Sequence, residues 1–239
     1  MIKKICCLIR RILGINGINS LMQEIVACHY LQMSIQGIEW LKINSFSPGA
    51  FNWAMDSLAL LNVFKIINNT KPKNILEFGL GESSKLIHQY ATYSGTNALT
   101  VEHDKVWEDY FVNQFPALKI NIKNLELLEI NFQGKNTLIY KNIDSIAQNQ
   151  YDLIIVDGPF GEEWHEYSRI QILDFIPQGL NDTFCIFIHD TERKGEQNML
   201  NLLQQKLKSN AIKFHIRNYC SIKWHTVVCS DNLKFLTML

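Results

Sequence analysis

The chain has 239 residues, of which 47% are hydrophobic, 11% aromatic and 19% charged. This apolar content is enough for a buried core and excludes a wholly disordered chain. The 23 basic and 23 acidic residues balance, so the formal net charge is zero. Because binding to a phosphate backbone needs a basic excess, the composition argues against nucleic acid as the main ligand.

Near the N-terminus, the basic pairs Lys3-Lys4 and Arg10-Arg11 flank an apolar stretch of only five residues. This stretch is too short for a signal peptide or a membrane span. Their pattern is that of an amphipathic helix. Residues 1–13 are therefore a candidate for peripheral contact with the inner face of a membrane. The alternative is that the helix packs on its own domain or on another subunit of a homo-oligomer. None of the six cysteines forms a C-x-x-C pair, which argues against structural zinc and favours a reducing cytoplasm.

Two domains are expected along the chain. Residues 1–49 form an N-terminal helical segment that ends in the turn Ser47-Pro48-Gly49, and residues 50–239 form the main domain, which begins with a helix near Phe51–Ile67. The stretch 124–149 is ambiguous, although a strand-like run follows Gly134.

From residue 74 onward, strand and helix patterns alternate. The expected strands cover 74–79, 98–102, 118–122, 151–157, 183–189, 212–217 and 224–229, and the helices between them include 83–94, 105–115 and 164–176. Apolar strands of this kind predict an α/β fold, a Rossmann-like doubly wound and mostly parallel seven-stranded sheet with a C-terminal antiparallel hairpin. In such sheets ligands bind beyond the carboxyl ends of the strands.

The first strand ends in Glu77-Phe-Gly-Leu-Gly-Glu-Ser-Ser84. Gly79 and Gly81 allow a tight turn and close approach of the backbone to a ligand, with a helix N-terminus just beyond. Ser84 stands where a dinucleotide-binding motif has glycine or alanine. The acid at position 77 suits a cationic group such as an amino-acid ammonium, although an ordinary strand-to-helix turn is the alternative.

The second strand ends in Val101-Glu102-His103-Asp104, 21 residues after Gly81. An acid at this distance commonly accepts hydrogen bonds from the ribose hydroxyls of a nucleoside cofactor. Glu102 is preferred because it directly ends the apolar run, whereas Asp104 fits a helix cap.

These two strand ends resemble the class I S-adenosylmethionine-dependent methyltransferases. Glu77–Ser84 is similar to the first motif of that family and Thr100–Asp104 to the second. The resemblance covers residues 50–239 and implies a methyltransferase-like Rossmann domain that binds S-adenosylmethionine. The cofactor-binding residues that it implies are Glu77, Gly79, Gly81, Ser83, Ser84, Glu102 and Asp157.

A narrower resemblance involves Glu77–Ser84, Asp152–Gly161 and Ile188–Arg193. These segments are similar to methyltransferase-like proteins associated with bacterial surface-polysaccharide synthesis, and to plant enzymes that methylate glucuronic acid on xylan. The resemblance implies O-methylation of a sugar or another small hydroxyl-bearing acceptor.

The fourth and fifth strands end in Asp157 and in His189-Asp190-Thr191, which are expected to be neighbours. Catechol-type methyltransferases place metal-binding acids at these strand ends, so the resemblance implies that Asp157 and Asp190 hold Mg²⁺ or another divalent cation. Thr191 stands where those enzymes have asparagine. In the metal-free alternative His189 is the general base, and Asp157 contacts the cofactor or positions the substrate.

The segment after Gly161 contains candidate acceptor-binding residues. Trp164 and Tyr167 offer aromatic faces for a sugar, and Arg169 offers a partner for a carboxylate or phosphate. Simple packing of this segment is the alternative.

Two other functions are compatible with the sequence. An NAD-dependent oxidoreductase is compatible with the acid after the second strand, but Glu77 and Ser84 weigh against it. A non-catalytic nucleotide-binding or scaffold protein of the same fold is the other.

Overall fold

The computed structural model describes residues 15–49, 53–161 and 166–239. Its helices are α2 (Ile15–Ser34), α3 (Ser57–Thr70), α4 (Glu82–Ser94), α5 (Lys105–Gln114), α6 (Asp144–Ala147) and α7 (Lys194–Ser209), with the 3₁₀ helices η2 (Ile170–Phe175) and η3 (Asp231–Met238). Its strands are β1 (Asn74–Phe78), β2 (Asn97–Glu102), β3 (Ile122–Asn124), β4 (Leu127–Phe132), β5 (Lys135–Tyr140), β6 (Tyr151–Val156), β7 (Leu180–His189), β8 (Phe214–Cys220) and β9 (Trp224–Ser230).

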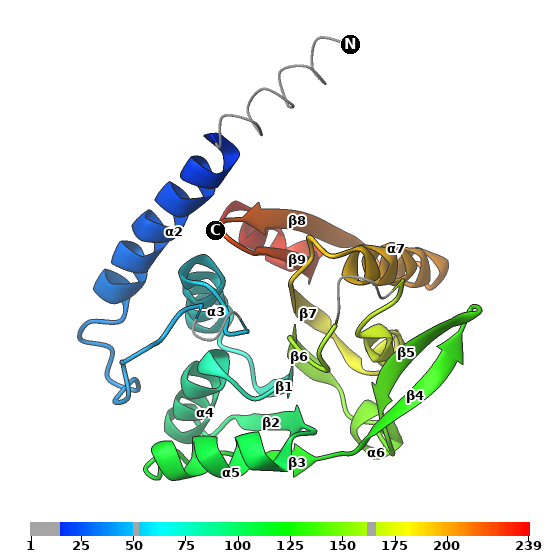
Figure 1. Ribbon diagram of the computed structural model, residues 1–239, viewed down its shortest axis with the longest axis horizontal. Helices are drawn as coiled ribbons and strands as arrows, with labels where there is room; N and C mark the ends of the chain where they lie inside the picture. The colour runs from blue at the N-terminus through cyan, green and yellow to red at the C-terminus, as the bar shows by residue number, and fades with distance from the viewer. Residues whose placement is uncertain (1–14, 50–52, 162–165) are drawn as a thin grey trace.

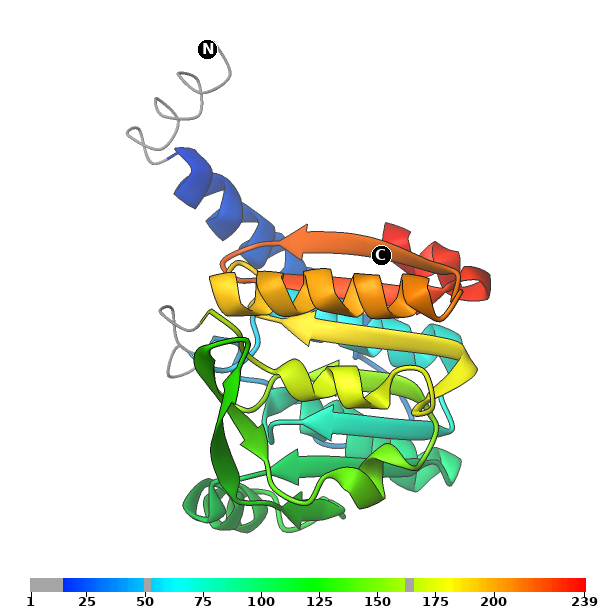
Figure 2. The ribbon, with the colours of Figure 1, turned by 90° about the vertical axis from the view of Figure 1, so that its right-hand side faces the viewer.

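The main sheet has seven strands in the order β3-β2-β1-β6-β7-β9-β8 (Figure 1). β9 is antiparallel to β7 and β8, and the other neighbouring strands are parallel. The parallel strands therefore end along one edge, at the left of Figure 2. This topology confirms the predicted doubly wound, mostly parallel sheet with a C-terminal antiparallel hairpin and an N-terminal helical extension.

Both faces of the sheet are covered, because alternate side chains of each central strand enter two different cores. Ile75 of β1 and Leu153 of β6 belong to the core under α2, α3 and α4, whereas Leu76 and Ile154 belong to the core under η2 and α7. Figure 1 shows these helical layers on opposite sides of the strands. Packing on both faces fixes the strands, and so fixes the positions of the residues at their ends.

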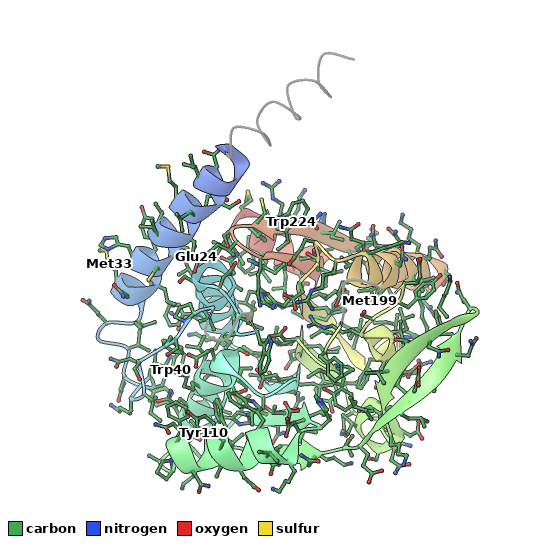
Figure 3. The ribbon with its side chains drawn as sticks, in the orientation of Figure 1. Glu24, Met33, Trp40, Tyr110, Met199 and Trp224 are labelled. Carbon is green, nitrogen blue, oxygen red and sulfur yellow. The ribbon has the colours of Figure 1, made fainter. Side chains whose placement is uncertain are left out.

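Helix α2 buries only one face. Ala27 and Leu31 enter the same core as α3, and Glu24 accepts a hydrogen bond of 2.6 Å from the Ser57 N–H. In Figure 3, Glu24 lies on the side facing the domain and Met33 on the outer side. The described part of the N-terminal segment thus packs as a layer of the main domain. The outer face leaves seven large apolar side chains more than half exposed: Ile18, Leu21, Met22, Ile25, Val26, Tyr30 and Met33.

The described part of the chain leaves this outer face of α2 uncovered, and the homo-oligomer predicted from the sequence stays a prediction. The predicted membrane contact of residues 1–13 lies outside the described residues. In the described ranges, none of the helices combines the length and the apolar character needed to span a bilayer.

The first two helical segments are shorter than predicted. The helix expected near Phe51–Ile67 begins at Ser57, because the Asp56 side chain accepts a hydrogen bond of 2.9 Å from the Ala59 N–H and caps the helix there. In the N-terminal segment, α2 ends before Gly37, whose φ of +71° leaves the helical region.

Two later elements also differ from the prediction. The strand expected over 118–122 forms as β3 instead, because Leu118 packs with Phe111 in a small separate core beside α5. The helix expected over 164–176 is reduced, in the described residues, to η2. Arg169 takes a left-handed backbone conformation with φ of 55° immediately before η2 and interrupts the helical path.

The ambiguous stretch 124–149 contains an antiparallel hairpin of β4 and β5, which turns at Gly134 with φ of 80°. The hairpin stands beside the carboxyl edge of the main sheet (Figure 2). It therefore adds side chains to the edge where a ligand is expected.

Candidate active site

Four neighbouring strands, β2, β1, β6 and β7, end side by side at the carboxyl edge. Glu102 is the last residue of β2, Gly79 follows β1, Asp157 follows β6, and His189 is the last residue of β7. These strands pair in parallel, each with the next. The structure therefore brings the strand-end residues predicted from the sequence to one site.

The loop after β1 uses its two glycines for different reasons. Gly79 has φ of +93°, and a Cβ there would lie 3.0 Å from the main-chain oxygen of Asp157. Gly81 has an extended backbone, and a Cβ there would meet no atom within 4 Å. The space beside Gly81, at the start of α4, is thus open to a ligand that approaches the backbone.

Glu77 lies beneath this loop. Its fully buried carboxylate accepts hydrogen bonds from the hydroxyls of Ser83 at 2.6 Å, Ser84 at 2.6 Å and Thr100 at 2.7 Å. The Ser84 hydroxyl also accepts a hydrogen bond of 2.9 Å from the Gly81 N–H, which explains a serine in place of a third glycine. The structure thus gives the side chains of Glu77, Ser83 and Ser84 a positioning role, since they hold the loop in shape from below.

We expect this network to make stability depend on pH. Burial raises the pKa of Glu77 from 4.5 to about 7, although its hydroxyl partners lower it in part. Between these values the native protein holds a proton that the unfolded chain releases, so stability falls as pH rises through the window. From about pH 5 to about pH 8, the free energy of unfolding should fall by about 3 kcal/mol more in the wild type than in Glu77→Gln.

Urea unfolding of both proteins at the two pH values measures this difference. His88, whose pKa burial lowers to about 4, contributes the opposite slope, because its stabilisation is lost as pH falls from 6.5 towards 4. His88 is present in both proteins, so the comparison cancels its effect. Parallel pH profiles for the two proteins would contradict the titration of Glu77.

Glu102 joins the end of β2 to the loop after β1. Its carboxylate accepts hydrogen bonds from the N–H groups of Leu80 at 2.8 Å, His103 at 2.6 Å and Asp104 at 2.9 Å. Burial raises the pKa of Glu102, but the His103 side chain and these N–H groups outweigh burial and hold the pKa below its usual value. Glu102, for which the sequence predicts a ribose contact, is therefore ionised at neutral pH and lies beside the loop after β1.

Tyr140, which the sequence did not single out, also lies at these strand ends. It ends β5, is only 1% exposed, and stacks on Phe78 with 5.8 Å between ring centroids. A Cβ on Gly158 would lie 2.6 Å from the Tyr140 hydroxyl, which has no hydrogen-bond partner among the described residues. The strand-like pattern of 137–140 was the only signal for this residue.

Asp157, His189 and Asp190 form a cluster at the ends of β6 and β7. One ligand atom from each lies within 4.8 Å of the others. His189 Nδ1 is 3.0 Å from Asp157 Oδ1. Burial lowers the pKa of His189, but the two carboxylates outweigh burial and raise it above its usual value. The Asp157 side chain is 18% exposed, against 4% for Asp190 and 0% for His189, so a ligand reaches the cluster at Asp157.

Arg169, a predicted acceptor-binding residue, is instead buried behind the cluster, with 2% of its side chain exposed. Its Nη2 lies 2.9 Å from Asp190 Oδ2 and 3.3 Å from Asp157 Oδ1. Its other nitrogens donate to the main-chain oxygens of Val156, Pro159 and His189. The guanidinium is thus occupied by protein oxygens and does not face an acceptor.

The other two predicted acceptor-binding residues have different outcomes. Trp164 lies outside the described residues. Tyr167 packs edge-on against Phe132 of β4, and its hydroxyl donates a hydrogen bond of 2.7 Å to Gln133. The structure therefore places Tyr167 against the β4–β5 hairpin.

Three exposed aromatic residues that the sequence did not single out belong to segments near the cluster. Trp53, Phe160 and Trp224 are 80%, 50% and 41% exposed. The Lys223 Nζ donates to the Trp53 main-chain oxygen at 3.2 Å and lies 3.6 Å from Asp190 Oδ1. Phe160 comes shortly after β6, and Trp224, which Figure 3 labels, begins β9, whose first residues pair with the end of β7.

Comparisons with known proteins define the fold. No protein-family model and no curated protein matches this chain. Among solved structures, a candidate caffeoyl-CoA O-methyltransferase of Staphylococcus aureus matches with a TM-score of 0.57 and 13% identity, covering 87% of this chain and 99% of the other.

Two further neighbours were solved with ligands. The O-methyltransferase of Streptomyces achromogenes involved in tomaymycin synthesis, in complex with S-adenosylmethionine, matches with a TM-score of 0.55 and 10% identity over 86% of this chain and 95% of its own. The methyltransferase of Podospora anserina bound to S-adenosylhomocysteine matches with a TM-score of 0.54 and 13% identity over 85% and 93%. At these identities the likeness establishes the fold, which is that of the class I S-adenosylmethionine-dependent methyltransferases.

Proposed function

We propose that this protein transfers a methyl group from S-adenosylmethionine to a hydroxyl oxygen of a small acceptor. The observation that carries the proposal is the open space beside Gly81, with Glu102 on one side and Asp157 on the other. An open loop at a helix start, next to an acid after the second strand, suits a nucleoside cofactor.

The residues at the site fit this cofactor. Gly79 and Gly81 would lie against its methionine part, and Glu102 would accept hydrogen bonds from its ribose hydroxyls. The two neighbours solved with S-adenosylmethionine or S-adenosylhomocysteine support this cofactor over NAD.

When bound, the cofactor supplies a methyl group already activated by its sulfonium, so the chain must orient the acceptor, exclude water and remove a proton. Asp157 is the carboxylate of the cluster that an acceptor hydroxyl reaches. All described polar side-chain contacts of Asp157 use Oδ1, from His189 and Arg169. The other oxygen therefore receives the acceptor proton, while His189 and Arg169 hold the carboxylate in place.

The acceptor that we propose is a sugar or a sugar-linked group. Trp53, Phe160 and Trp224 are exposed on segments near the cluster, and aromatic faces pack on the apolar faces of sugar rings. The sequence resemblance to proteins of bacterial surface-polysaccharide synthesis supports the same class of acceptor. We propose, as the sequence predicts, that the protein acts in the cytoplasm.

Calorimetric titration with S-adenosylhomocysteine tests the cofactor. We expect saturable one-site binding to the wild type. Gly81→Val should bind at least about tenfold more weakly, because its side chain enters the space of the cofactor. The variant should still fold, since its Cβ would meet no protein atom within 4 Å.

Gly17→Val is the matched control, because a Cβ at this position of α2 also meets nothing within 4 Å and lies far from the strand ends in sequence. It should bind like the wild type. If the folded wild type fails to bind S-adenosylhomocysteine, the proposal is wrong. Binding of NAD under the same conditions would then favour the oxidoreductase, and binding of neither would favour the scaffold protein. Methyl transfer from labelled S-adenosylmethionine to a panel of sugars then identifies the acceptor.

A further inference from the structure

We propose that the Arg169 guanidinium stands in the place of a divalent cation between Asp157 and Asp190, so that the site operates without a metal. The place of the guanidinium between these two acids is seen directly in the described structure. Only its consequence for turnover rests on the proposed function.

Among the described residues, Asp157, His189 and Asp190 have the spacing of a metal site, with ligand atoms within 4.8 Å of one another. However, Arg169 Nη2 already lies 2.9 Å from Asp190 Oδ2 and 3.3 Å from Asp157 Oδ1. The guanidinium thus already contacts one oxygen of each carboxylate, and a divalent cation bound through either acid would meet its positive charge beside that oxygen. The residues present therefore do not fit a metal.

The guanidinium is held on all sides. Besides the two carboxylates, Nη1 donates to the main-chain oxygens of His189 at 2.8 Å and Val156 at 3.4 Å. Nε donates to the main-chain oxygen of Pro159 at 3.3 Å. The five N–H groups of an arginine thus have five protein oxygens within reach, and no position at the guanidinium remains for an exchangeable ion.

Cationic side chains already surround the acids of the cluster. Glu196 Oε1 lies 3.6 Å from Arg169 Nε. Beside Arg169, two further cations reach Asp190: Arg193 Nη1 at 3.0 Å and Lys223 Nζ at 3.6 Å. A divalent ion would add further positive charge beside these three cationic side chains.

The backbone is arranged to bring this side chain to the acids. Arg169 has φ of 55°, a left-handed conformation that non-glycine residues adopt at a cost of about 1 kcal/mol. It stands immediately before η2 and turns its side chain under the ends of β6 and β7. Such a conformation persists where the surrounding contacts require it.

The absence of a metal position has a consequence for the acceptor. Because Arg169 is 2% exposed, it cannot take the acceptor oxygen as a ligand in the way that a metal ion would. The acceptor therefore needs no pair of adjacent hydroxyls for chelation. Its proton must pass to a side chain, and Arg169 acts as a positioning residue that holds Asp157 and Asp190.

Titration with Mn²⁺ tests the inference in the absence of cofactor and acceptor, by calorimetry and by the electron paramagnetic resonance signal of free Mn²⁺. The wild type should show no saturable binding at millimolar Mn²⁺. Arg169→Met removes the guanidinium and leaves the acids. It should therefore bind one Mn²⁺ with a dissociation constant at least about tenfold below the millimolar range tested on the wild type, and bound Mn²⁺ should raise its thermal stability.

Arg193→Met is the matched control, because it also removes a cation from Asp190 but leaves Arg169 in place. It should not bind Mn²⁺. If Arg169→Met does not fold, Arg169→Met with Glu196→Gln removes one buried acid together with the cation and is titrated instead. Saturable Mn²⁺ binding by the wild type that is lost in Asp157→Asn would overturn the inference, as would a folded Arg169 variant that binds no Mn²⁺.

The outcome is separable from that of the proposed function. A wild type that binds neither S-adenosylhomocysteine nor Mn²⁺ would contradict the methyltransferase proposal and would still agree with Arg169 occupying the place of a divalent cation. Where methyl transfer is found, its rate should be unchanged by a chelator, and loss of the rate in EDTA with recovery in Mg²⁺ would contradict a metal-free site.

Discussion

Replacing Asp157 by asparagine should lower the rate of methyl transfer by about 10²- to 10⁴-fold, the range for loss of a general base. The carboxylate is the part of the cluster that an acceptor reaches, at 18% exposure. Asparagine keeps its size but cannot take up the acceptor proton. The affinity for S-adenosylhomocysteine should change much less than the rate, because Gly79, Gly81 and Glu102 remain in place.

The measurement is single-turnover methyl transfer from labelled S-adenosylmethionine, with calorimetry of S-adenosylhomocysteine on the same samples. Asp182→Asn is the control, since Asp182 is an exposed acid near the start of β7, at the opposite edge of the sheet. It should retain the wild-type rate. A rate in Asp157→Asn within a few-fold of the wild type would remove Asp157 as the base and direct attention to His189.

The sheet and its ligand edge could be predicted from local sequence. The apolar runs that became β1, β6 and β7 are short and bounded by turn residues, and their alternation with helices implies a parallel sheet. Parallel topology then brings the carboxyl ends together, whatever the details of packing. For this reason Asp157 and His189 were expected to be neighbours, and His189 Nδ1 lies 3.0 Å from Asp157 Oδ1.

The roles of individual side chains at that edge could not be predicted in the same way. Glu77 has the position of a ligand-binding acid in the sequence, but Ser83, Ser84 and Thr100 take up its carboxylate, and these contacts exist only once α4 and β2 pack together. Tyr140 reaches the site because the β4–β5 hairpin folds back, which no local pattern encodes.

Arg169 is the clearest example of a side chain whose role the sequence does not predict. It lies 20 residues from His189 in the chain, in a segment whose pattern predicts a helix, and on a helix it would have faced the solvent or an acceptor. Its left-handed backbone instead turns it towards the two acids. Whether the acids bind a metal thus depends on one long-range ion pair, which sequence spacing does not reveal.

Replacing Glu102 by glutamine should weaken binding of S-adenosylhomocysteine by about 10- to 100-fold, since hydrogen bonds to a charged group contribute about 1.5–3 kcal/mol. This variant loses two contributions to cofactor binding. The carboxylate is the proposed acceptor for the ribose hydroxyls, and it holds the Leu80 N–H at 2.8 Å, which fixes the Gly79–Gly81 loop. An amide keeps one acceptor oxygen and turns an NH₂ group towards donors.

Calorimetric titration of the variant measures the loss, and Asp109→Asn, an exposed acid on α5 whose partner is Lys105, is the control. The comparison with S-adenosylmethionine-derived fragments separates the two losses. If Glu102 acts only on the loop, methionine should lose more affinity than adenosine, because the proposed position of the loop is against the methionine part of the cofactor. If Glu102 also contacts the ribose, adenosine should lose the most and methionine the least. Unchanged affinity for all three compounds would show that the acid after β2 does not belong to a nucleoside site, and Glu102 would then be only an anchor for the loop.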